Sequence, residues 1–139
     1  MNQTVDDLDW EILKILKGDS RISNVSIAGK LKISEGSVRQ RISKLKKSGV
    51  ITKFTIETSS RGLKALLGIN IEVNVHTTEI AKKIRSLDGV ERVYEVSGDS
   101  DIVAVIDVSN TIELNDTIEA VRGMGHITNT RTKLVLGEI

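Results

Sequence analysis

Residues 24–54 read NVSIAGKLKISEGSVRQRISKLKKSGVITKF. Apolar residues recur in this stretch at helical spacing, which predicts two helices, about 24–31 and 35–48, joined by a short turn. Ser34 is a good N-cap for the second of these helices. The alternation that follows predicts a strand over 50–57. The stretch is therefore typical of a helix-turn-helix motif followed by a wing or by a swapped linker strand.

The second helix has two unlike sides. Val38, Ile42 and Leu45 fall together and predict a buried face, whereas the opposite side is polar and basic. Segment 35–53 holds six Lys or Arg residues and one acid, Glu35. The pattern favours a helix that binds duplex DNA, although a solvated Lys-rich face or a protein-docking helix is the alternative.

The residues expected to contact DNA divide into two groups. Small, amide and basic side chains on the outer face suit base edges in the major groove. Basic side chains beside them suit phosphates, which set register without reading sequence. The first group consists of Gly36, Ser37, Arg39, Gln40 and Lys44. The second group consists of Arg41, Lys46, Lys47 and Lys53.

Charge is distributed unevenly along the 139 residues, although the formal net charge is only +1. Residues 1–60 carry 11 basic and 7 acidic side chains, and residues 61–139 carry 9 basic and 12 acidic ones. The change of sign supports two domains with different partners. We expect a DNA-binding domain at 1–57, a linker at 58–64 and a second domain at 65–139.

Composition excludes several classes of protein. The chain has no Cys, which removes a disulfide scaffold, a zinc finger and a thiol nucleophile. No apolar run approaches the roughly 20 residues that cross a bilayer, and the polar, acidic N-terminus is unlike a signal peptide. We therefore expect a cytoplasmic protein without a membrane partner.

The remaining pattern predicts an α+β chain. An amphipathic helix is expected at 7–17, ahead of the helix-turn-helix motif. After the linker, the expected order is strand, helix, strand, strand, helix, strand, which is the ferredoxin-like βαββαβ arrangement. The expected spans are 67–75, 77–87, 90–97, 102–108, 110–122 and 127–136. Thr77 is the expected cap of the first of these helices, and Asn110 with Glu113 forms a capping box for the second.

Catalytic and metal-binding patterns are absent from the sequence. It contains no nucleophile–base pair, phosphate loop or set of metal ligands, so we expect neither an enzyme nor a cofactor. His76 and His126 lie 50 residues apart at the ends of predicted elements, where surface or capping roles are typical.

Four pieces of the sequence together resemble the Lrp/AsnC (leucine-responsive, feast-famine) family of transcription regulators. They are VDDLDWEIL at 5–13, the apolar spacing from Ile27 to Ile51, VSGDSD at 96–101 and TRT at 130–132. The resemblance covers nearly the whole chain. It implies an N-terminal helix-turn-helix (winged-helix-like) domain that binds pseudo-palindromic DNA as a dimer, and a ferredoxin-like domain that dimerises through its sheet and assembles further, for instance as a tetramer of dimers.

The resemblance also implies a small effector, commonly an amino acid, bound in a cleft between dimers. The implied contact residues are Gly98, Asp99, Ser100, Asp101, Asn110, Thr130 and Thr132. The chain differs from the family pattern at Ser100, where an aromatic residue is frequent, and at Ser109-Asn110, where Pro-Asp is frequent. The alternatives are an orphan regulator without an effector, a small-molecule sensor that docks proteins, and an ordinary hairpin with solvated acids at 98–101.

Overall fold

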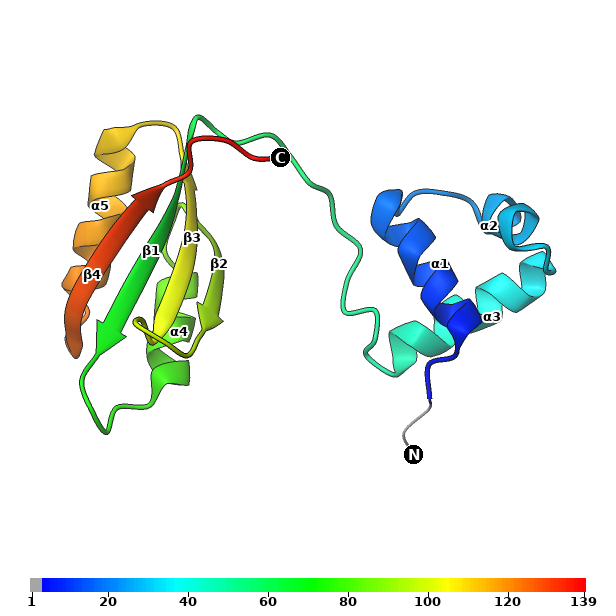
Figure 1. The fold of residues 1–139 in the computed structure, drawn as a ribbon, viewed down its shortest axis with the longest axis horizontal. Helices are drawn as coiled ribbons and strands as arrows, with labels where there is room; N and C mark the ends of the chain where they lie inside the picture. Colours follow the sequence, from blue (N-terminus) through cyan, green and yellow to red (C-terminus); the bar gives the residue numbers. More distant parts are fainter. Residues whose placement is uncertain (1–3) are drawn as a thin grey trace. The chain divides into compact units, whose positions relative to one another are not determined.

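The computed structural model describes residues 4–139. The chain separates into two compact units, one up to Thr58 and one from Ser59 to Ile139, and each is described by itself (Figure 1). Three helices build the first unit: α1 (Asp7–Gly18), α2 (Asn24–Leu31) and α3 (Glu35–Lys47). The helices expected at 7–17, 24–31 and 35–48 are confirmed, with ends that agree to within one residue.

Polar caps start each of these helices. The side chains of Asp6, Ser23 and Ser34 accept a hydrogen bond from a backbone N–H in the first turn that follows, and this satisfies a donor that has no partner inside the helix. The apolar sides of the three helices meet in a small aliphatic core. Its buried members are Ile12, Ile27, Ala28 and Val38.

The prediction of a strand over 50–57 is wrong. The segment has no regular secondary structure, and no strand of residues 4–139 pairs with it. It remains close to the helices through the Ile51 N–H, which donates to the Leu45 carbonyl at 3.0 Å, and through Phe54, whose ring centroid lies 5.9 Å from the Lys46 ammonium. A run with strand-like residues becomes a strand only where a neighbour takes its backbone N–H and C=O groups.

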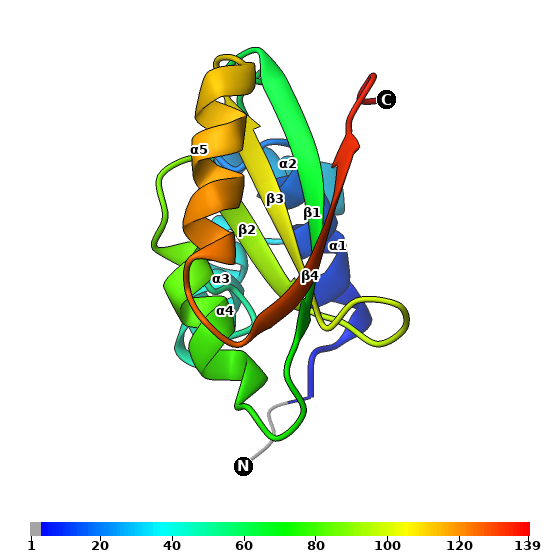
Figure 2. The same ribbon diagram turned by 90° about the vertical axis from the view of Figure 1, so that its left-hand side faces the viewer.

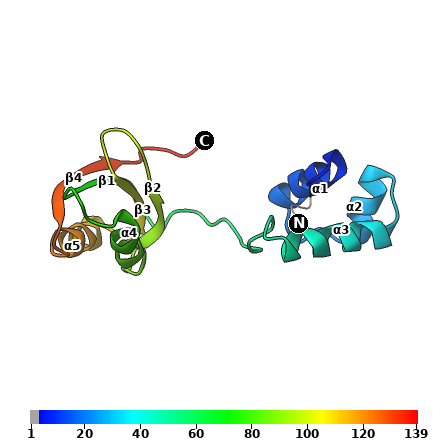
Figure 3. The ribbon, with the colours of Figure 1, turned by 90° about the horizontal axis from the view of Figure 1, so that it is seen from below.

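The second unit has the predicted βαββαβ order. Its elements are β1 (Leu63–Ile71), α4 (Thr77–Arg85), β2 (Val90–Glu95), β3 (Ile102–Val108), α5 (Thr111–Arg122) and β4 (Ile127–Leu134). The strands form one antiparallel sheet in the order β2-β3-β1-β4. Both helices cover the same face of this sheet (Figure 2, Figure 3). The predicted α+β class and ferredoxin-like fold are thus confirmed.

Strand alternation gives the sheet two different faces. Buried aliphatic residues of β1 and β3, such as Leu67 and Ile106, pack against Ile84 and Ile118 of the helices. We call the opposite side, which neither helix covers, the open face. It carries the side chains of β1 and its neighbours that alternate with the core set. Apolar members of this face are Leu66, Tyr94, Val103 and Val105.

The largest shift from the predicted bounds is in β1. The alternation predicts a strand over 67–75, but the ladder ends at Ile71 after an irregularity at Asn70, and Asn74 turns the chain with a φ of 69°. At its other end β1 starts at Leu63, inside the segment expected to be a linker. His76, rather than Thr77, is the N-cap of α4.

Candidate functional site

Helix α3 presents a polar, largely basic face to solvent. Val38 and Leu45 are buried, Val38 in the core that α3 shares with α1 and α2, so the opposite side of the helix points outward. Most of the predicted DNA contacts are exposed there, and Gly36 and Ser37 are half-buried at the start of the helix. Figure 3 shows α3 along one side of the unit. The exposed members are Arg39, Gln40, Lys44, Lys46 and Lys47.

The start of α3 leaves room for another molecule to approach its backbone closely. A Cβ built on Gly36 would meet only the Arg39 guanidinium at 3.9 Å, so packing within the chain does not require glycine there. Ser34 accepts a hydrogen bond from the Ser37 N–H at 3.1 Å and orders the first turn. The first turn of α3 is therefore ordered without a bulky side chain over it.

Arg39 and Lys46 have partners within the unit, and the partner of Lys46 is the Phe54 ring. Arg39 forms an i,i+4 ion pair with Glu35 at 2.9 Å, which is exposed and adds little stability. Gln40 and Lys44 line a groove that α3 forms with the start of α1, including Val5. Lys53 is exposed on the irregular segment after α3.

Arg41 has a different position from the one expected. Its guanidinium nitrogen Nη1 lies 2.7 Å from a carboxylate oxygen of Asp6 and 2.9 Å from one of Asp9, and only 27% of its side chain is exposed. The hydrogen bond from Arg41 and the Asp9 N–H lower the pKa of the Asp6 carboxyl. The same two carboxylates raise the pKa of Arg41. Arg41 therefore links α3 to the start of α1 through these two carboxylates.

Helical geometry contains a signal for this result. At about 100° per residue, Arg41 falls about 60° from Val38, which is closer to the buried face than to the outer one. The carboxylate partners carry no such signal, because they lie more than 30 positions earlier in the chain. The presence of two acidic residues there already has a local explanation, because negative charge at the start of α1 interacts favourably with the helix dipole.

The turn at 98–101 is folded back onto β1 over the open face. Asp101 accepts a hydrogen bond from the Ile71 N–H at 2.9 Å and donates its own N–H to the Ile69 carbonyl at 3.0 Å. Ser100 lies against Gly68, where a Cβ would come within 2.7 Å of the Ser100 hydroxyl oxygen. Gly98 has a φ of 122°, which a side chain would oppose. The turn is thus ordered by β1.

The other residues implied for the effector do not gather around this turn. In β4, Thr130 and Thr132 pair with Ile69 and Leu67, whose side chains are in the core, so both threonines belong to the helix-covered side. Thr130 Oγ1 accepts a hydrogen bond from the Arg122 Nε at 3.1 Å. Within one chain, therefore, the turn and the two threonines lie on opposite faces of the sheet.

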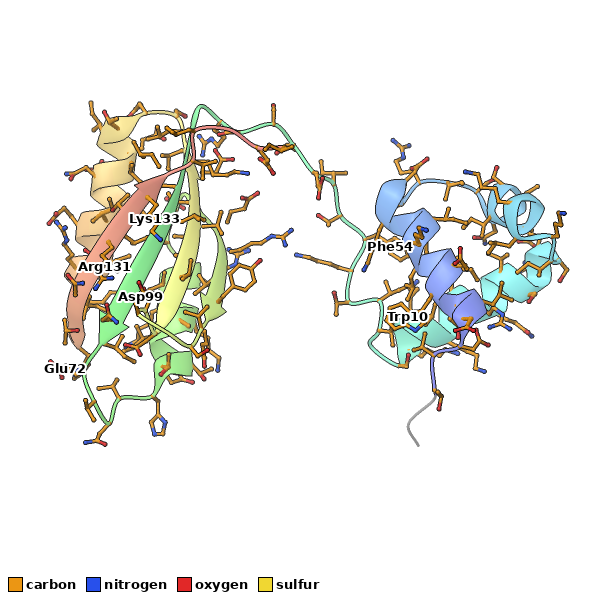
Figure 4. The ribbon with its side chains drawn as sticks, in the orientation of Figure 1. Trp10, Phe54, Glu72, Asp99, Arg131 and Lys133 are labelled. Atoms are coloured by element: carbon orange, nitrogen blue, oxygen red, sulfur yellow. The ribbon has the colours of Figure 1, made fainter. Side chains whose placement is uncertain are left out.

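Asn110 lies far from the turn at 98–101, whereas Arg131 lies beside it. Asn110 caps α5 by accepting a hydrogen bond from the Glu113 N–H at 3.0 Å, at the end of β3 that is remote from the turn. Arg131 reaches Asp99 with an N–O distance of 3.2 Å (Figure 4). Arg131 is not among the effector contacts that the resemblance implies, although period-two alternation separates it from Thr130 and Thr132.

No helix in residues 4–139 combines the length and apolar character needed to cross a membrane. Among the same residues, no three His, Cys, Asp or Glu side chains come together as a group that could hold a metal ion.

Two family models match this chain. One, described as winged helix-turn-helix DNA-binding, matches residues 5–52, and the other, described as Lrp/AsnC ligand binding domain, matches residues 64–139. Each match falls on one of the two compact units.

Curated relatives agree with these models over nearly the full length. The HTH-type transcriptional regulator LysM of Sulfurisphaera tokodaii is 41% identical over 133 residues, which cover 95% of this chain and 95% of the relative. The HTH-type transcriptional regulator FL11 of Pyrococcus furiosus is 32% identical over 139 residues, covering 98% and 92%. Both names are those of regulators, in agreement with the expectation that the chain is not an enzyme.

Solved structures share the architecture. AsnC of E. coli superposes with a TM-score of 0.81 at 25% identity and covers 97% of this chain and 94% of its own. A transcriptional regulator of Neisseria meningitidis in complex with L-Met has a TM-score of 0.86 at 20% identity, covering 98% and 92%, which shows a common fold. The matches of both units to family models and the similarity to relatives over nearly the full length show that the chain belongs to the Lrp/AsnC family of DNA-binding transcription regulators.

Proposed function

We propose that the outer face of α3 reads the operator. Gly36, Ser37, Arg39, Gln40 and Lys44 contact base edges, and Lys46, Lys47 and Lys53 contact phosphates. The observation that carries the proposal is the exposure of this basic face opposite the buried Val38 and Leu45. Arg41 is left out of the phosphate contacts because its Nη1 already pairs with Asp6 and Asp9 and its side chain is mostly buried.

The proposal is tested by measuring binding to the upstream region of the protein's own gene at several salt concentrations, by fluorescence anisotropy. Binding should weaken steeply with salt, because each neutralised phosphate adds about −0.9 to the slope of log K against log salt. Lys53→Ala should weaken all duplexes alike and reduce the slope by about 1. Gln40→Ala should instead relax sequence preference, by about 1–3 kcal/mol at one base pair.

Arg41→Met is the informative companion variant. If Arg41 only positions α3, affinity falls while the salt slope is unchanged, because no phosphate contact is lost. A slope reduced by about 1 would return Arg41 to the phosphate contacts. Binding that does not respond to salt would refute the whole proposal, and the reverse pattern for Gln40 and Lys53 would refute the division into base and phosphate contacts.

The second unit is proposed to bind a small effector and to hold the copies together. We infer that residues 1–57 bind DNA, while the β1 to β4 unit forms a dimer through its open face and dimers assemble further, as a tetramer of dimers. The partly exposed Leu66 and Tyr94 on this face support the pairing. A two-fold dimer implies a pseudo-palindromic operator. A transcription regulator binds chromosomal DNA, which agrees with the proposed cytoplasmic location.

An amino acid is the proposed class of effector. The support is the match to the ligand-binding family model and the L-Met complex of the Neisseria meningitidis structure. An amino acid that binds the native state alone will raise the temperature of unfolding, so a thermal-shift screen of the standard L-amino acids tests this part. No shift with any of them would favour an orphan regulator.

A further inference from the structure

The segment that joins the two units, residues 52–60, has neither helix nor strand but is held at both of its ends (Figure 1). Within the first unit, the Ser20 hydroxyl donates to the Thr55 carbonyl at 3.4 Å. Within the second unit, the Ser60 hydroxyl and the Arg61 N–H both donate to the same oxygen of Asp107, at 2.9 Å and 2.8 Å. We call the two bonds to Asp107 the clasp.

The backbone around the clasp is packed onto the end of β3. Asp107 is half-buried on this strand, and the Ser60 hydroxyl that donates to it also accepts from the Gly62 N–H at 3.2 Å. Gly62 has a φ of 142°, and a Cβ there would lie 2.9 Å from the Ser109 carbonyl oxygen, so this position requires glycine. The clasp therefore fixes the point at which the chain leaves the second unit.

Only a short piece of chain lies between the two anchored ends. We call residues 56–59 the tether. In the part of the chain that the structure describes, residues 57–59 make no hydrogen bond or ion pair. From Thr55 to Ser60 a fully extended chain spans at most about 18 Å. Opening the clasp would free the chain as far as Leu63, where β1 starts, and would add about 10 Å to this reach.

We propose that Asp107, by holding the clasp, determines which separations of operator half-sites the protein accepts. The proposal rests on the dimer and the pseudo-palindromic operator proposed above, and it makes Asp107 a positioning residue that does not touch DNA. Once one helix-turn-helix unit of the dimer has bound, the second binds at an effective concentration that the tether length controls. A short tether reaches half-sites at one separation, whereas a longer one reaches several.

The clasp is compatible with the proposed contact between copies. Both of its bonds lie within one chain, so a second copy on the open face does not have to displace them. One carboxylate oxygen accepts both bonds, which means that position and acceptor capacity, rather than charge, carry the proposed role.

Four variants of the full-length protein separate tether length from charge. Asp107→Ala removes the acceptor, whereas Asp107→Asn keeps an oxygen that accepts from both donors. Insertion of Gly-Ser-Gly after Ser59 lengthens the tether while leaving the clasp in place, and it should behave like Asp107→Ala. Glu57→Ala is the matched control, because it removes a carboxylate of the tether that has no hydrogen bond or ion pair in the described chain.

Trypsin measures whether the clasp restrains the chain. The peptide bond after Arg61 lies beside the clasp, and mass spectrometry identifies its cleavage by the fragment that begins at Gly62. Cleavage should be about tenfold or more faster in Asp107→Ala than in the wild type, because two hydrogen bonds no longer oppose local opening. Asp107→Asn and Glu57→Ala should be cleaved at the wild-type rate. Equal rates for Asp107→Ala and the wild type would overturn the clasp.

Spacing preference is measured by fluorescence anisotropy on the duplex that the protein protects upstream of its own gene. The half-sites are kept at their native separation or moved apart by two base pairs, which is about 7 Å. The wild type, Asp107→Asn and Glu57→Ala should bind the separated half-sites at least about tenfold more weakly than the native ones. Asp107→Ala and the insertion should lose less than about threefold, and should bind the native duplex about twofold more weakly than the wild type because a longer tether lowers the effective concentration.

The outcomes separate this inference from the function on which it rests. If the wild type binds DNA with salt sensitivity but Asp107→Ala keeps the wild-type spacing preference, the role of Asp107 is overturned and the DNA-binding function stands. A wild type that binds both duplexes equally also refutes the role of the tether. Absence of salt-sensitive binding by the wild type refutes the function itself. Asp107→Ala should sediment with the wild-type mass, and a changed mass would show that Asp107 acts through the contact between copies instead.

Discussion

Gly36 occupies the second position of α3, where the fold itself has room for a methyl group. We expect Gly36→Ala to keep or increase stability, by up to about 1 kcal/mol, since Ala is the better helix former. A methyl group between α3 and a duplex should lower DNA affinity by about tenfold, because close packing there leaves no room for it. Anisotropy and thermal unfolding together make the measurement.

Gly29→Ala is the control for this experiment. Gly29 also lies in a helix, α2, with no atom within 4 Å of an added Cβ. It should gain similar stability without loss of DNA affinity. Equal affinity for the Gly36→Ala variant and the wild type would remove Gly36 from the DNA-facing set.

Lys32 ends α2 in the left-handed region, with a φ of 54°. This conformation is costly for a residue with a side chain, so Lys32→Gly should raise the free energy of unfolding by about 1 kcal/mol. Lys30→Gly, within the last turn of α2, should lower it by a similar amount. Trp10, the one tryptophan of the chain, lies in α1 and reports unfolding of the first unit by fluorescence (Figure 4). Destabilisation by Lys32→Gly would contradict the assignment of strain.

Among elements, the contact of α1 with α3 depends on charge as well as on the apolar core. Because the pKa of Asp6 is lowered in the folded chain from its usual 3.8, the stabilisation is present above that value and is lost as the pH falls through the folded-state pKa. The first unit should therefore lose stability below about pH 4, as measured by Trp10 fluorescence during thermal unfolding.

Asp6→Asn tests this pH dependence. The variant should be less stable than the wild type at pH 7 and should lose less stability on acidification, because an amide keeps no charge for Arg41. Asp7→Asn, on the neighbouring position of the same helix end, provides the control. Parallel pH profiles for the wild type and Asp6→Asn would show that the ion pair does not couple α1 to α3.

The elements also show where periodicity stops being informative. The alternation along β1 has the right phase from Leu67 to Ile71, yet its continuation at Val73 lies in a turn, where this residue is 86% exposed. Likewise, the residues over 50–57 suit a strand, but no strand within residues 4–139 pairs with them. Alternation describes which face a side chain takes, whereas a ladder requires a second strand at hydrogen-bonding distance.

For the whole molecule, the open face of the sheet is where a second copy is expected. Leu66 is on a central strand of this face, so Leu66→Glu places a carboxylate in the proposed interface. In a two-fold dimer the change occurs twice, and taking each added carboxylate out of water costs several kcal/mol. We expect the variant to sediment as a monomer in analytical ultracentrifugation, with an unchanged far-ultraviolet circular dichroism spectrum.

Val73→Glu is the matched control for the dimer. Val73 is an exposed apolar residue in the turn after β1, outside the sheet, and its replacement should leave the mass of the assembly unchanged. If Leu66→Glu has the same mass as the wild type, the copies associate through another surface.

The sequence by itself determined the helices, the order of the strands and the outer face of α3, because capping residues and apolar periodicity act over a few neighbouring positions. Tertiary structure alone decided that Arg41 joins Asp6, that Asp101 ties its turn to β1, and that Arg131 rather than Thr130 faces Asp99. Those partners lie about 30 residues or more apart in the chain. Local pattern specifies the face that a side chain takes, whereas only the packed sheet and helices determine which distant group meets it there.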